Sequence, residues 1–180
     1  MVIINSIVTA NGETIIIRET QPADAGALLQ FLEKVGAESE FLTFGPGELA
    51  MTVAEEEKFL AGFAAQKNSL ALIALSQTEI VGSLTFIGGK RKRIEHAGEF
   101  GLSVLKEYWQ QGIGCALIKR MLEWCRQSGI RKVNLRVRED NLAAIRLYQK
   151  FSFREEGRIS REFYLNGRFY ASLAMGLTID

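Results

Sequence analysis

The stretch VLKEYWQQGIGCALIKRMLEWCRQSG, residues 104–129, decides the fold of this chain. An apolar strand breaks into a short loop, Gly112 and Gly114 follow, and a long amphipathic helix starts at once. The first turn of a helix carries unpaired N–H groups and the positive end of the helix dipole, so it suits a phosphate. Glycines let an anion approach the main chain with no Cβ in the way. The stretch therefore predicts a site for a phosphate-bearing ligand.

Three interpretations of the two glycines compete. A dinucleotide-binding fingerprint needs a third glycine three residues after the second, where this chain has Leu117. A P-loop needs Gly-Lys-Ser/Thr after a four-residue gap, and the sequence contains no such string. The remaining alternative is a tight strand-to-helix turn that binds nothing. The glycines alone do not decide between that turn and a phosphate site.

The downstream sequence adds a second group of polar residues. In RKVNLRVRED, apolar residues alternate with polar ones from 133 to 137, which predicts a strand with one buried face. The segment NLAAIRLYQKF is helical and follows the cap residues Asp140 and Asn141. Tyr148 comes seven residues after Asn141, so an amide and a phenol share one helix face. We expect this face to lie near the glycine loop, one strand away.

These segments resemble a known family. YWQQGIGCALI and NLAAIRLYQKFSF, in this order and at this separation, are similar to the motifs of the GCN5-related N-acetyltransferases (GNAT). The resemblance covers about residues 14–178. It implies an α/β (α+β) fold with a central mixed, mostly antiparallel twisted sheet of about six or seven strands, flanked by about four helices. It also implies acetyl-CoA (coenzyme A) as co-substrate.

The resemblance assigns roles to the residues around the two motifs. The backbone of Leu102, Ser103 and Val104 would align the amide-rich arm of coenzyme A like an added strand, and the N–H of Val104 would face the carbonyl oxygen of the thioester. Asn141 would hydrogen-bond the same arm. The loop that would hold the diphosphate consists of Gln110, Gln111, Gly112, Ile113, Gly114 and Cys115.

Acetyl transfer also needs proton transfer. Tyr148 is the expected general acid, because a phenol with an ordinary pKa near 10 stays protonated at neutral pH and can donate to a thiolate. Glu99, on the strand before the loop, is a candidate base, since a carboxylate beside an apolar cleft can have a raised pKa. A surface role for Glu99 and a reaction without a dedicated base are the alternatives.

The chain departs from the family pattern at two places. Trp109 stands where the family often has Arg or Gln, so backbone N–H groups, helped by Gln110 and Gln111, would have to bind most of the diphosphate. Ser152-Phe153 replaces the common Gly-Phe after the second motif, and serine tolerates that helix exit less easily than glycine.

Composition excludes several classes of protein. The net charge of +1 offers no general field for nucleic acid or membranes. The N-terminus has no basic leader and no apolar run approaches 18 residues, so we expect a cytoplasmic protein without a spanning helix. Cys115 and Cys125 lie too far apart on one helix for a disulfide, and with a single histidine, His96, no metal site is expected. A homodimer is one candidate assembly.

We expect a single domain over residues 1–180. Strands at 2–9 and 14–19 flank Asn11-Gly12, a hairpin signal, and Pro22 begins a first helix. Thr52 and Glu55 form a capping box for a second helix that runs to about residue 66. The other expected elements are strands at 70–75, 80–87 and 95–105, a basic turn at 88–93, and two closing strands around Asn166-Gly167.

The sequence therefore predicts an acetyl-CoA-dependent N-acetyltransferase that acts on a primary amine of a small molecule or a protein N-terminus. A catalytically silent acetyl-CoA sensor is the alternative. The acceptor pocket is expected between the first two helices, the side of the 88–93 turn and the closing hairpin. The residues that would suit a cationic amine there are Glu33, Glu38, Glu40, Phe41 and Phe44.

Overall fold

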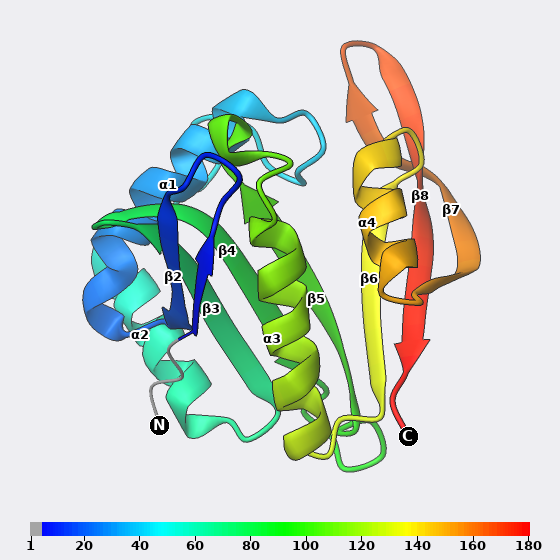
Figure 1. Ribbon diagram of the computed structural model, residues 1–180. Coiled ribbons are helices and arrows are strands. Elements are labelled where there is room, and N and C mark those ends of the chain that lie inside the picture. The colour runs from blue at the N-terminus through cyan, green and yellow to red at the C-terminus, as the bar shows by residue number, and fades with distance from the viewer. Residues whose placement is uncertain (1–4) are drawn as a thin grey trace.

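The computed structural model describes residues 5–180, and its centre is one eight-stranded sheet (Figure 1). The order across the sheet is β1-β2-β3-β4-β5-β6-β8-β7. The strands are β1 (Asn5–Val8), β2 (Thr14–Glu19), β3 (Ser69–Ser76), β4 (Glu79–Gly88), β5 (Ala97–Val104), β6 (Lys132–Arg138), β7 (Arg154–Leu165) and β8 (Arg168–Thr178). Every neighbouring pair is antiparallel except β5 and β6, which are parallel.

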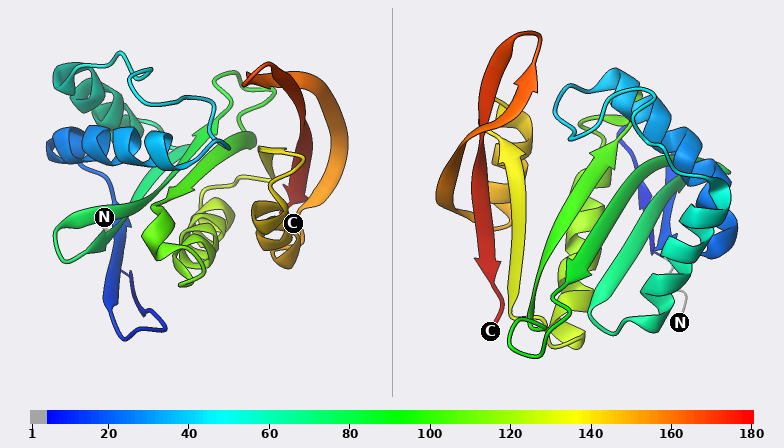
Figure 2. Two further views of the ribbon diagram at one scale, coloured as in Figure 1. Left: turned by 90° about the horizontal axis from the view of Figure 1, so that it is seen from above. Right: turned by 180° about the vertical axis from the view of Figure 1, so that it is seen from behind.

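Four α-helices cover the two faces of this sheet. Helices α1 (Ala25–Glu38) and α2 (Val53–Ala65) lie on one face, and α3 (Ile113–Gln127) and α4 (Leu142–Lys150) lie on the other (Figure 2). Helix α3 connects the parallel strands β5 and β6, which need a crossover of this kind. The fold class expected from the sequence is confirmed.

The strand count exceeds the expected six or seven, because the N-terminal strand β1 pairs with β2 and joins the same sheet. The hairpin between them turns at Gly12, where φ is +85°. Residues 2–4 of the strand expected at 2–9 lie outside the described residues. The strand expected at 95–105 is shorter, Ala97–Val104, and the basic turn follows Gly88, which still belongs to β4.

Local signals place both helices of the first face. The capping box is confirmed, since Thr52 Oγ1 accepts from the Glu55 N–H and Glu55 returns a carboxylate oxygen to the Thr52 N–H. Pro22 opens a short 3-10 turn, Pro22–Asp24, and α1 follows directly. Arg18 of β2 donates two hydrogen bonds of 2.7 Å to Asp24 and fixes this corner.

The core lies between the sheet and the helices on each face. On one side, α3 buries Leu117, Met121 and Cys125 completely. Its approach to β4 is close, because a Cβ on Gly82 would lie 3.1 Å from Ile113 Cγ2. In β6, Val133, as expected from the alternation, is buried on the same face with Leu135 and Val137. This close packing of α3 on β4 fixes where the helix begins relative to the strands.

The backbone is strained at Ser152, just after the end of α4, as expected for a serine at a position where the family commonly has glycine. Ser152 adopts φ of +67°, in the left-handed region that favours glycine. Its N–H donates to the carbonyl of Gln149, and the next N–H, of Phe153, reaches the carbonyl of Tyr148. The strain is therefore held by the end of α4 and by burial of Phe153.

We predict that Ser152→Gly stabilises the protein by about 0.5 kcal/mol, because relief of the left-handed strain exceeds the extra freedom of glycine in the unfolded chain. Urea unfolding measures the change. Ser128→Gly is the matched control, since Ser128 ends α3 with φ of −95° and has no such strain to relieve. If Ser152→Gly lowers stability as Ser128→Gly is expected to do, the strain is not there.

Candidate active site

The parallel strands β5 and β6 separate partway along their length (Figure 1). They pair over three positions, from Ala97 opposite Lys132 to Glu99 opposite Asn134. Strand β5 nevertheless continues to pair with β4 as far as Val104, and β6 with β8 as far as Arg138. Beyond Glu99 each strand therefore has one neighbour only. We call this opening the wedge; one side is residues 100–104 and the other is residues 135–138.

Backbone groups of β5 alternate between β4 and the wedge. The N–H of Gly89 donates to the carbonyl of Ala97, and the N–H of Leu105 donates to the carbonyl of Val81, so the odd-numbered residues of β5 bond to β4. The N–H and C=O groups of Leu102 and Val104 consequently point into the wedge. Those of Ser103 point to β4. Of the three residues expected to align a ligand, Leu102 and Val104 thus direct backbone groups into the wedge, and Ser103 does not.

Side chains of the glycine loop hold the loop in place. Trp109 Nε1 donates to the carbonyl of Val104 at 2.7 Å, and Gln111 Nε2 donates to the carbonyl of Glu107 at 2.9 Å. The Trp109 bond engages the Val104 carbonyl, while the Val104 N–H still faces the wedge. Trp109 thus anchors the loop to the end of β5, a role that its sequence position did not reveal. The Gln111 amide group points back along the chain.

The two glycines have different functions. Gly112 caps α3 with φ of +87°, and nothing lies within 4 Å of where its Cβ would be, so the main chain there is open to a ligand. A Cβ on Gly114 would lie 3.2 Å from Leu147 Cδ2 of α4. Gly114 therefore permits close packing of α3 against α4. Gln110, with φ of +61°, provides the sharp turn before Gly112.

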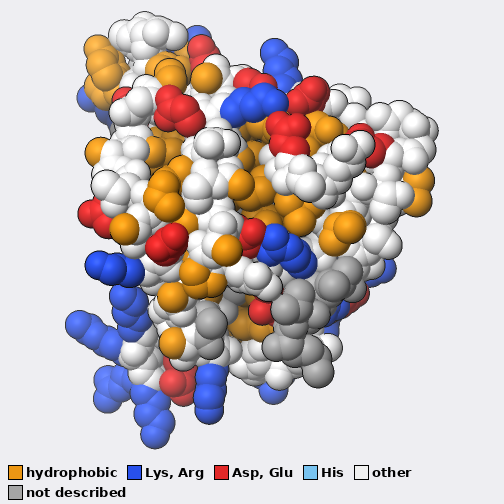
Figure 3. Space-filling model, turned by 90° about the vertical axis from the view of Figure 1, so that its left-hand side faces the viewer, with side chains coloured by type: hydrophobic (Ala, Val, Ile, Leu, Met, Phe, Trp, Pro, Cys, Tyr) orange, Lys and Arg blue, Asp and Glu red, His pale blue; other side chains and the backbone are white. Residues whose placement is uncertain are grey.

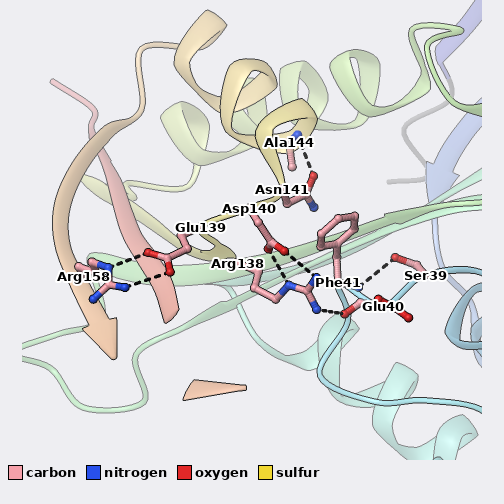
Figure 4. Close-up of polar contacts among 9 residues, drawn as sticks. All are labelled: Ser39, Glu40, Phe41, Arg138, Glu139, Asp140, Asn141, Ala144 and Arg158. Atoms are coloured by element: carbon pink, nitrogen blue, oxygen red, sulfur yellow. Dashed lines mark hydrogen bonds and ion pairs between the residues drawn. The ribbon is translucent and has the colours of Figure 1, made fainter. Parts of the chain in front are cut away.

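Tyr148 of α4 packs against β5 on the face of the sheet that α3 and α4 cover. Its ring packs edge-on against Phe100 at 5.8 Å and against Phe153 at 6.1 Å between centroids. Only 7% of the residue is exposed, and this burial raises the pKa of Tyr148 to about 12. The hydroxyl consequently keeps its proton at neutral pH. Asn141 caps α4, with Oδ1 accepting from the Ala144 N–H at 3.2 Å, which leaves its NH₂ group for another partner (Figure 4).

Glu99 lies on the opposite face of the sheet. Successive side chains of a strand alternate between faces, so Glu99 points away from α4 where Phe100 points toward it. Its Oε1 accepts from Arg136 Nε at 3.0 Å, and Arg136 Nη1 donates to Glu162 at 2.7 Å. Glu99 therefore belongs to a half-exposed cluster of ion pairs. The sequence analysis had instead expected its carboxylate to lie beside an apolar cleft.

Arg138 is a buried arginine that the sequence analysis missed. Its side chain is 3% exposed and donates two hydrogen bonds to Asp140, which lower the pKa of that carboxyl, and one to the carbonyl of Glu40 (Figure 4). The guanidinium lies over the rings of Phe41 and Tyr170, 4.6 and 4.2 Å from their centroids. It thereby ties the segment after α1 to β6, to the residues before α4 and to β8. The sequence signal was a strand that ends in Arg-x-Asp.

Two of the carboxylates expected to attract an acceptor hold the backbone instead. Glu33 accepts from the Gly47 N–H at 2.8 Å, and Glu38 accepts from the Lys106 N–H at 2.9 Å. The 88–93 turn begins where β5 and β6 are paired, at the end away from the open wedge (Figure 2). Lys and Arg side chains gather at that lower end of the molecule (Figure 3). The expected contribution of this turn to the acceptor pocket is wrong.

Residues 5–180 contain neither a metal site nor a membrane-spanning helix. No group of three or more His, Cys, Asp and Glu side chains in that range is arranged to hold a metal ion. None of the helices described is both long and apolar enough to cross a bilayer. Cys115 is half-buried in the first turn of α3, and burial raises the pKa of the Cys125 thiol to about 12.

The wedge, the glycine loop and the crossover helix define the class of this protein. The chain matches the family model described as "Acetyltransferase (GNAT) family" over residues 27–153, and it belongs to that family. The L-amino acid N-acetyltransferase AaaT of Escherichia coli is 31% identical over 99 residues, which cover 54% of this chain and 61% of that protein. The match thus spans less than two thirds of this relative.

Solved structures agree over nearly the whole chain. A GNAT-family acetyltransferase from Streptococcus pneumoniae is 35% identical, with a TM-score of 0.89 that covers 92% of this chain and 99% of the other. An acetyltransferase from Salmonella typhimurium, solved with acetyl-CoA, has a TM-score of 0.81 at 16% identity over 92% of this chain and 94% of the other. The latter likeness concerns the fold alone.

We predict that Gly112→Ala raises the Kd for coenzyme A at least about tenfold, because a Cβ at the start of α3 strains the loop and narrows access to its N–H groups. Gly129→Ala is the matched control, since Gly129 follows the other end of α3 with φ of +73° and equally open surroundings. Both changes should cost about 1 kcal/mol of stability. Calorimetry that finds equal Kd values for the two variants would contradict the site.

Proposed function

We propose that this protein is an acetyl-CoA-dependent N-acetyltransferase and that the wedge between β5 and β6 receives the thioester. The observation that carries the proposal is the unpaired edge of β5, which opens directly beside the start of α3. The extended amide-rich arm of coenzyme A can bind such an edge as an added strand does. The N–H groups of Leu102 and Val104 are the donors available for it.

The donor-binding residues follow from this placement. We assign the diphosphate to the N–H groups of residues 112–115, where the helix dipole is positive. We assign the free NH₂ group of Asn141 to a carbonyl of the arm. The side chain of Gln111 contributes indirectly, through its hydrogen bond to the loop backbone. A diphosphate and a chain of amides are what this combination of groups fits.

Backbone and side-chain groups of the protein would act at two points of the reaction. Attack of an amine on a thioester builds negative charge on the carbonyl oxygen and then expels a thiolate. The N–H of Val104, or that of Leu102, would stabilise the charge. Tyr148 would donate its proton to the leaving sulfur. The position of Tyr148, buried under β5 and packed on Phe100, supports this role, because the raised pKa keeps the hydroxyl protonated.

Glu99 is our candidate for receiving the proton of the amine. It lies on the face of the sheet opposite Tyr148, so donor and acceptor would approach the wedge from different sides. Its ion pair with Arg136 holds the carboxylate in place at the point where the strands separate. The acceptor is a primary amine of a small molecule or of a protein N-terminus.

Thiol release from acetyl-CoA across a panel of amines and peptides tests the function. We expect release that depends on the amine. Binding of acetyl-CoA without release on any acceptor would instead support a sensor.

We predict that Tyr148→Phe lowers kcat at least about tenfold at saturating substrate, because the thiolate then leaves without a proton. The KM for acetyl-CoA should change little. Tyr108→Phe, at the half-buried tyrosine before the loop, is the control. Since burial raises the pKa of Tyr148 above that of a free phenol, its ionisation should cause no loss of kcat below about pH 10. An unchanged kcat would rule out the acid role.

We predict that Glu99→Gln lowers kcat/KM and removes the acidic limb of its pH profile, because the amide cannot take a proton from the amine. Glu79→Gln, which removes an exposed partner of Lys34, is the control and should leave the profile unchanged. If the limb persists in Glu99→Gln, Glu99 is not the base.

A further inference from the structure

Strand β7, which β8 separates from β6, contains a large bulge. Ile159 lies opposite Ser172 and Phe163 lies opposite Tyr170, so residues 160–162 of β7 face residue 171 alone on β8. Arg161 has φ of +55° within this bulge. The chain is thereby redirected, and Glu162 reaches Arg136 of β6 across the intervening strand β8. Bulges of this kind often re-aim a side chain near an active site.

Two buried oxygen atoms near this bulge lack a hydrogen-bond partner among the described residues. One is Glu162 Oε2, whose sister oxygen accepts from Arg136, and the other is Ser172 Oγ. Ser172 is completely buried. A buried polar atom without a partner is costly, so such atoms usually bind water or a ligand. We call these two atoms the niche.

Both side chains of the niche lie on the face opposite α4. Ser172 is two residues from Tyr170 on β8, so their side chains share a face. The ring of Tyr170 covers the guanidinium of Arg138. Arg138 and Arg136 are also two residues apart, so their side chains share a face of β6. Arg136 in turn holds Glu162. This is also the face on which Glu99 lies.

One carboxylate oxygen of the niche is available to a cation. The carboxylates of Glu99 and Glu162 share the single guanidinium of Arg136, and the nearby guanidinium groups of Arg161 and Arg168 lie over the rings of Phe169 and Tyr170. The charge of Arg138 is matched by Asp140. Both arginines of β6 are thus fully engaged, and neither is free to bind a carboxylate. An ammonium group, by contrast, would find an unpaired carboxylate oxygen.

The niche lies close to the reacting centre but not at it. Arg136 Nε donates to Glu99 Oε1 at the point where the wedge begins, and Arg136 Nη1 donates to Glu162 Oε1. Glu162 comes from β7, two strands beyond β6, and two strand spacings are about 10 Å. Its side chain reaches part of the way back. A group bound there would therefore be several ångströms from the amine that attacks.

We propose that Glu162 and Ser172 form an ammonium-binding subsite and that the acceptor is a diamine or polyamine, whose second, non-reacting ammonium group occupies it. This inference rests on the proposed function, because it places the acceptor on the Glu99 face of the wedge. The subsite selects acceptors with two cationic nitrogens over monoamines. It also disfavours acceptors with a free carboxylate beside the amine.

Calorimetric titration tests the subsite without turnover. The protein is saturated with coenzyme A and titrated with hexamethylenediamine or with n-hexylamine, which has the same carbon chain and one ammonium group. We expect the diamine to bind at least about tenfold more tightly to the wild type. Glu162→Gln should abolish that preference, and Ser172→Ala should reduce it.

Glu156→Gln is the matched control, because Glu156 also lies on β7 and pairs with Lys132 of β6, at the closed end of the strands. It should keep the preference for the diamine. Equal binding of both amines by the wild type, or a preference that survives in Glu162→Gln, would overturn the subsite and leave a buried water there. Thermal unfolding confirms that each variant is folded.

Thiol release separates this inference from the function on which it rests. If n-hexylamine and the diamine are acetylated equally well by the wild type and by Glu162→Gln, the transferase stands and the subsite fails. If the wild type prefers the diamine in titrations but releases no thiol with any amine, the subsite stands and the proposed function fails.

Discussion

The limited pairing of β5 with β6 is the constraint on which the site depends. Each strand is held along its whole length by another neighbour, β4 or β8, and the two meet over three positions only. The separation leaves unpaired backbone groups in the interior of a sheet, and such groups need a partner. An extended ligand rich in amides is a suitable one.

The glycine loop is positioned by the same strand. Trp109 hydrogen-bonds the last carbonyl of β5, and α3 begins four residues later against β4. The end of the wedge and the positive end of the helix are thereby fixed relative to one another. On the face of the sheet opposite α3 and α4, Arg138 of β6 donates to the carbonyl of Glu40 and so fixes the segment after α1 to β6. One face thus carries groups that fit a coenzyme, and the other carries ion-paired carboxylates.

Sequence reasoning predicted the parts of the structure that local interactions determine. The capping box at Thr52, the buried alternation of β6 and the start of α3 all follow from nearby residues, and they are confirmed. The resemblance to a family supplied the sheet. Gly114 was interpreted as part of the anion site, but its packing against Leu147 depends on a helix far along the chain.

The residues that were missed depend on long-range register. Glu162 reaches Arg136 only because of a bulge, and no local pattern in the sequence signals it. Arg138 is buried because an aromatic side chain from another segment covers it. The expected roles of Glu33 and Glu38 were based on charge alone, whereas backbone N–H groups occupy both carboxylates.

Amide hydrogen exchange followed by NMR, with and without coenzyme A, tests the central claim most directly. The wedge predicts that the amides of Leu102 and Val104 exchange quickly in the free protein and slowly in the complex. The amide of Ser103, already bonded to β4, should change little and serves as the internal reference. Coenzyme A that binds without slowing exchange at Leu102 and Val104 would contradict this account of the site.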